Sequence, residues 1–182
     1  MKDRLSHHAG PGLTLPTREI DNAVLFRLVK EALDEGHTAT VRARGISMRP
    51  FIEHERDIIM LAAVRAEEIK RGDAVLAETK TGLFVLHRVI RREGNVLTLK
   101  GDGNWRGTES CEVENVIARA VAFYRKGRQK PDLVCGMKWR IYSKVWMALS
   151  PVRRLLLAFH RRIYLKLFPV KICGGIIGGK SI

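Results

Sequence analysis

The sequence predicts a mainly β protein: a small, coiled all-β domain with an N-terminal amphipathic helix and basic C-terminal helices. Short apolar runs separated by turn residues fill the middle of the 182-residue chain, a pattern typical of small barrels and sandwiches. Apolar residues recur at helical spacing before and after these runs. The excess of positive charge is concentrated near the C-terminus, where acidic residues are nearly absent, and this sets the last helices apart from the β-domain.

The N-terminal part combines a tail with one helix. Residues 1–17 contain Gly-Pro-Gly at positions 10–12 and no periodicity, so we expect a flexible tail. A helix is expected over residues 18–35, with Thr17 as N-cap and Gly36 as its stop. The apolar residues of this helix recur at helical spacing: Ile20, Val24, Leu25, Leu28, Val29 and Ala32. Such a helix must pack its apolar face on another part of the protein.

The expected β-domain, counted with its leading helix, covers residues 18–129. The predicted strands are 38–43, 57–61, 74–77, 83–90, 96–99 and 116–124. Glycine-containing turns separate most of them. The pair 83–90 and 96–99 is joined around Gly94-Asn95, which predicts a β-hairpin.

Residues 130–182 form the expected basic helical extension. They hold 11 Lys and Arg against a single acidic residue, Asp132, within a chain of net charge +14. Helices are expected over 138–149 and 152–168, the second opened by Pro151. The charge favours an anionic partner, such as a membrane surface bound through residues 138–168. Alternatively, Trp139, Trp146 and Phe159 simply pack these helices on the β-domain.

Several classes of protein are disfavoured. The first thirty residues lack the apolar core of a signal peptide, and no stretch approaches the roughly 20 apolar residues of a spanning helix. The three cysteines (Cys111, Cys135 and Cys173) lack metal-ligand spacing, so we expect neither a metal site nor a cofactor. No second helix that could form a DNA-binding pair precedes the β-domain, which argues against nucleic acid as a partner. We expect a cytoplasmic protein or one held peripherally at the cytoplasmic membrane.

Two residues suggest nucleophilic chemistry. Ser47 lies between Gly45 and Pro50, which hold it on a bend where its hydroxyl can meet a substrate. A serine needs a base, and His87 is the only histidine inside a β-type run. His54 has the surroundings of a solvated loop residue, and the candidate lysines, Lys80 and Lys100, lie in turns. Each of the two residues, taken alone, has a structural role as its simpler explanation.

The spacing of three motifs resembles that of the signal-peptidase/LexA-like superfamily of serine peptidases. The chain matches the nucleophile motif Gly-x-Ser-Met-x-Pro at 45–50 and has His-Arg-Val at 87–89, 40 residues after the serine. Lys-Gly-Asp-Gly-Asn at 100–104 and Arg-Gly-Asp at 71–73 are further matches. The likeness covers residues 38–123. It is closest to the branch typified by endoplasmic-reticulum and archaeal signal peptidases, in which histidine replaces lysine as the base.

The resemblance implies a serine endopeptidase that cleaves a peptide or protein tail. Ser47 would be the nucleophile and His87 its base, and Asp102 would orient the imidazole or stabilise its charged form. The chain departs from the family at Gly45, where a second serine is usual, and at Thr108, where a second acid is expected and Glu109 stands beside it. These departures leave open a catalytically inactive peptide-binding or regulatory module on the same fold.

Overall fold

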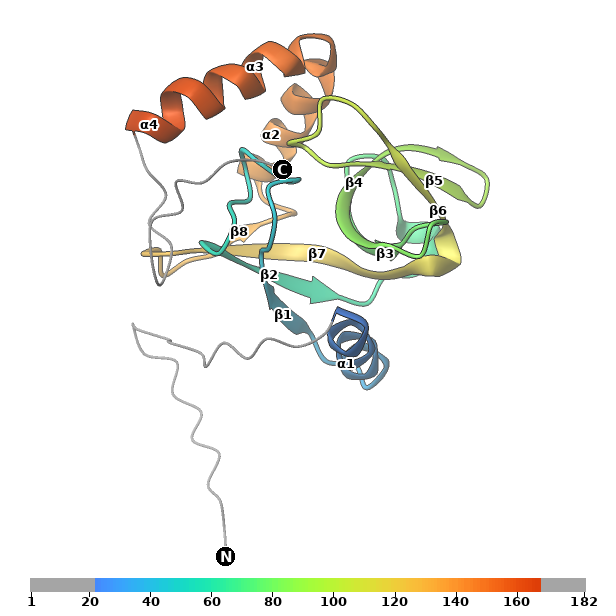
Figure 1. The fold of residues 1–182 in the computed structure, drawn as a ribbon. Coiled ribbons are helices and arrows are strands. Elements are labelled where there is room, and N and C mark those ends of the chain that lie inside the picture. The colour runs from blue at the N-terminus through green and yellow to red at the C-terminus, as the bar shows by residue number, and fades with distance from the viewer. Residues whose placement is uncertain (1–21, 168–182) are drawn as a thin grey trace, which may run out of the picture.

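The computed structural model of the chain describes residues 22–167. The described part is mainly β, as the sequence predicts, with one helix before the strands and a helical segment after them (Figure 1). The expected tail at residues 1–17 lies outside the described residues. The strands are β1 Ala39–Arg42, β2 Asp57–Ala62, β3 Ala74–Glu78, β4 Phe84–Glu93, β5 Val96–Lys100, β6 Glu109–Glu112, β7 Val116–Arg125 and β8 Asp132–Leu133.

The strands form one antiparallel sheet in the order β1-β2-β7-β3-β4-β5-β6, and β8 pairs with β7. Figure 1 shows that the half containing β3 to β6 curls over to make a half-barrel. The pairing register shifts within three of the strand pairs, for example between Leu76 and Ala77 of β3. Such irregularities bend a strand and increase its twist. The predicted hairpin is present, because β4 pairs with β5 around Gly94.

The helices flank the sheet. Helix α1 (Asn22–Asp34) precedes it, and η1 (Ala66–Glu68) and η2 (Val113–Asn115) are short 3-10 turns between strands. The C-terminal segment comprises α2 (Met137–Ala148), η3 (Ser150–Val152), α3 (Arg153–Phe159), the π-helical turn η4 (His160–Tyr164) and α4 (Leu165–Leu167). The predicted C-terminal helices therefore agree with the structure within a residue or two over the described residues.

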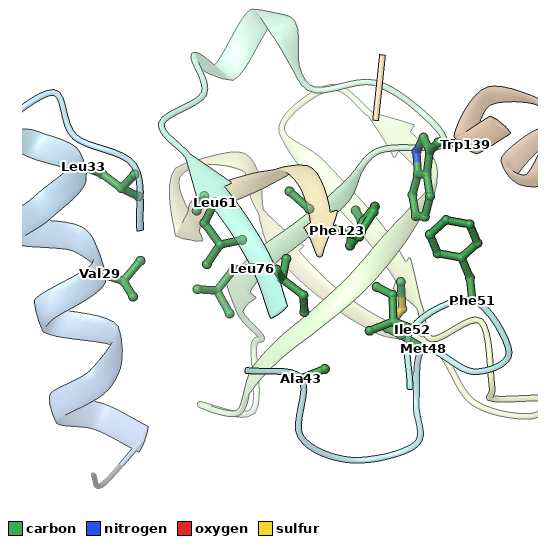
Figure 2. Close-up of a cluster of buried hydrophobic side chains, with 14 residues drawn as sticks. Val29, Leu33, Ala43, Met48, Phe51, Ile52, Leu61, Leu76, Phe123 and Trp139 are labelled. Atoms are coloured by element: carbon green, nitrogen blue, oxygen red, sulfur yellow. The ribbon is translucent and has the colours of Figure 1, made fainter. Parts of the chain in front are cut away.

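Two apolar clusters stabilise this arrangement. In the larger one, Val29 and Leu33 of α1 face Leu61 of β2, and at the other end Trp139 of α2 packs beside Phe51 and Phe123 (Figure 2). The smaller cluster lies inside the curled half of the sheet: Ile69, Val75, Ala77, Val89, Leu97, Leu99, Cys111 and Val113. Because Trp139 is only 3% exposed, helix α2 shares a hydrophobic core with the strands. No helix among residues 22–167 is both long and apolar enough to cross a bilayer.

Candidate functional site

Ser47 lies in the loop between β1 and β2, and buried neighbours hold this loop in place. Met48, Phe51 and Ile52 all enter the larger apolar cluster, while Ser47 itself is half-buried. Gly45 has a φ of 86°, in the left-handed region that favours glycine. These features fix the bend that carries Ser47.

His54 is part of the support for this bend. Its Nδ1 accepts a hydrogen bond of 2.9 Å from the backbone N–H of Gly45. The sequence suggested a solvated loop residue, whereas the structure shows a half-buried ring that ties the end of the loop to its start. The spacing of nine residues between the two partners gives no periodic signal from which this bond could be predicted.

His87 lies on β4 opposite Val75 of β3, and it is 4% exposed. Its Nδ1 lies 2.9 Å from Oε2 of Glu109. In the neutral imidazole, Nδ1–H donates to this carboxylate, which leaves the Nε2 lone pair available to accept a proton. This is the tautomer that a general base requires.

Gly101 shows how close Ser47 and His87 are. A β-carbon at this position would lie 2.5 Å from the Ser47 carbonyl oxygen and 3.0 Å from Nε2 of His87. Only a glycine fits between two such groups. The backbone N–H of Gly103 also donates to the Ser47 carbonyl, at 2.7 Å. The fold thus brings together the serine bend, the histidine and the loop over residues 101–104.

Asp102 makes contacts that the sequence did not predict. Its carboxylate accepts two hydrogen bonds from Arg88, at 2.8 and 2.6 Å, and a third from the hydroxyl of Tyr142 at 2.9 Å. The expected orienting contact to His87 is instead made by Glu109. Burial lowers the pKa of His87, and the negative charge of Asp102 still acts on the imidazole by partly opposing that shift, after the larger influence of Glu109.

Arg88 and Asp102 connect the site to helix α2. The Arg88 side chain is fully buried and donates to the backbone carbonyl of Gly72 at 2.8 Å and to Oγ of Ser143 at 2.5 Å. From the same helix, Nε1 of Trp146 donates to the backbone carbonyl of Asp102 at 3.1 Å. The loop over residues 101–104 is therefore fixed on one side by the serine bend and on the other by α2.

The electrostatics favour a neutral His87. Burial lowers its pKa below 6.5, and this effect outweighs the opposing influence of Glu109. A neutral histidine at pH 7 can accept a proton from a serine hydroxyl. The backbone N–H of Ser47 remains the candidate oxyanion donor implied by the resemblance. Among residues 22–167, no group of three or more potential metal ligands gathers.

Ser47 and His87, two of the three predicted site residues, thus meet around the loop over residues 101–104. The third, Asp102, contributes through its charge and through its ion pair with Arg88. Sequence reasoning missed Glu109 as the partner of His87. The signal was its position beside Thr108, where the resemblance led us to expect an acid. No family model, curated protein or solved structure matches the chain significantly.

Proposed function

We propose that this chain is a serine endopeptidase that cleaves an extended peptide or a protein tail. Ser47 attacks the peptide carbonyl, and His87 takes its proton and returns it to the leaving amine. Glu109 holds the imidazole and stabilises its charged form. The proposal is carried by one observation: Nε2 of His87 and the backbone of Ser47 meet at Gly101, while Nδ1 is engaged by Glu109.

The sheet offers a place for the substrate. Strand β1 is an edge strand, and the chain runs from its end at Arg42 into the bend that holds Ser47. A peptide that pairs with such an edge places its backbone by main-chain hydrogen bonds. The resemblance adds that small side chains near the cleavage point are preferred.

The experiment is peptide cleavage by the purified full chain, read by mass spectrometry. Small-residue peptides are incubated with wild type, Ser47→Ala and His87→Ala. Matched controls are Ser110→Ala, a half-buried serine of β6, and His37→Ala, an exposed histidine. Cleavage by wild type and both controls, but by neither site variant, supports the proposal. Cleavage that survives in Ser47→Ala contradicts it.

A peptide-binding module without catalysis is the second candidate. It is favoured because, among the described residues, the structure gives Oγ of Ser47 no hydrogen bond to His87. The same peptides, immobilised, distinguish the two functions. Equal binding by wild type and Ser47→Ala, with no cleavage by either across a broad library, identifies the binding module.

A further inference from the structure

The helix that runs through α3, η4 and α4 has an apolar face that the described protein does not cover. Leu155, Phe159, Ile163 and Leu167 are spaced four residues apart and are 70%, 60%, 44% and 68% exposed. Only Arg153 of α3 is buried. In the view of Figure 1 this helix runs along the outside of the molecule, beyond α2. Large apolar residues exposed in a row are typical of a docking surface.

Helix α2 carries a second exposed apolar row. Trp139 and Trp146 are buried against the domain, so the packing alternative raised from the sequence holds for these two side chains but not for Phe159. The opposite side of α2 exposes Met137, Ile141 and Val145, again four residues apart. We call these three residues, together with Leu155, Phe159, Ile163 and Leu167, the apolar surface of the C-terminal helices.

The charged side chains carried by these helices all have one sign, although Lys138 pairs with Asp132 of β8 and Arg153 is buried. Residues 137–167 contain eight basic side chains and no acidic one: Lys138, Arg140, Lys144, Arg153, Arg154, Arg161, Arg162 and Lys166. An apolar stripe flanked by basic residues matches the boundary between the headgroups and acyl chains of an anionic bilayer. A nucleic acid would satisfy the charges and leave the apolar side chains in water, so it fits less well.

Trp105 adds an aromatic side chain near this surface. It is partly exposed, and the guanidinium of Arg154 lies 4.8 Å from its ring centroid. Tryptophan is enriched at membrane–water interfaces because its ring has an apolar body and a polar tip.

From these features we infer that the apolar surface of the C-terminal helices docks on the surface of an anionic lipid bilayer. The helices lie in the plane of the interface, with the apolar side chains in the acyl boundary and the arginines and lysines among the headgroups. This inference is independent of the peptidase proposal, because it requires neither Ser47 nor His87.

The test is sedimentation of the full chain with vesicles. The vesicles contain phosphatidylcholine alone or with about 30% phosphatidylserine, since each basic residue near an anionic surface strengthens attachment. The key variant is Leu155→Glu/Phe159→Glu. Its matched control is Leu83→Glu/Val96→Glu, which changes the net charge equally at two exposed apolar residues of the β-domain.

We expect wild type to bind the anionic vesicles and to bind more weakly at about 0.5 M salt, where charge attraction is screened. The helix variant should bind at least about tenfold more weakly, because partitioning follows buried apolar area. The control variant and Ser47→Ala should bind like wild type. Absence of binding, or equal losses in the helix and control variants, overturns the inference. So does self-association, measured by sedimentation velocity, that the helix variant abolishes while vesicle binding is absent.

Discussion

The buried pair of Arg88 and Asp102 allows a prediction that needs no substrate. Replacing Asp102 with asparagine keeps the shape of the side chain and removes its charge. Arg88 is fully buried, and its carboxylate partner is 1% exposed, so the guanidinium would be left without a counter-charge in a site that water does not reach. Removing one partner of a buried ion pair costs about 3–5 kcal/mol.

This loss should be measured by urea unfolding at pH 7. With a slope of about 2 kcal/mol per molar urea, the transition of Asp102→Asn should move down by about 2 M. The control is Asp34→Asn, which breaks an exposed pair with Lys30. An exposed pair contributes only about 0–1 kcal/mol. If Asp102→Asn cost no more than this control, the pair would not stabilise the fold in the way that its burial implies.

The remaining predictions concern the site. Gly101→Ala should abolish cleavage, because its β-carbon would displace the Ser47 backbone. The control is Gly107→Ala, where a β-carbon has open space but φ is 79°; it should lose about 1 kcal/mol of stability and keep its activity. Equal peptidase activities of the two variants would refute this prediction. Because burial lowers the pKa of His87, the peptidase activity of wild type should fall only below pH 6.5. Glu109→Gln removes an influence that raises this pKa, so the acid limb of its pH–rate profile should move to lower pH, and its kcat should be lower. An unchanged or raised acid limb in a pH–rate profile would contradict this. The lowered pKa also means that His87 binds more protons in the unfolded chain than in the folded protein below about pH 6.5. Acidification from pH 7 to pH 5 should therefore lower the free energy of unfolding of wild type more than that of His87→Gln, as measured by urea titration. An equal loss of stability in the two proteins would contradict this prediction.

Strands that consist of a run of apolar residues could be located from the sequence, and strands that lack such a run could not. Strand β3, Ala74–Glu78, is almost wholly buried and gives a compact apolar run. Strand β6, Glu109–Glu112, reads Glu-Ser-Cys-Glu, and only Cys111 points into the core. Its place depends on pairing with β5, which local sequence does not encode. Strand β8 has only two residues and gives no pattern.

The candidate site shows the same division. Ser47 and His87 were predicted as site residues because each lies in a motif with defined spacing. The contact between His87 and Glu109 spans 22 residues and needs the register of three strands. The pairing of Arg88 with Asp102 follows from the register that sets Arg88 opposite Lys100, two residues before Asp102. Sequence reasoning named Ser47, His87 and Asp102 as candidates and could not determine which side chains are their partners.

The hold of helix α2 on Asp102 has a consequence for the order in which the protein is made. Ser47, His87 and Glu109 have all been synthesised before the ribosome adds Tyr142 and Trp146. A growing chain folds from its N-terminus, but until α2 has emerged the Asp102 carboxylate lacks the Tyr142 hydroxyl and its backbone carbonyl lacks the Trp146 indole. The loop beside the serine therefore reaches its final set of contacts only after α2 has emerged from the ribosome, later than the side chains of the site themselves.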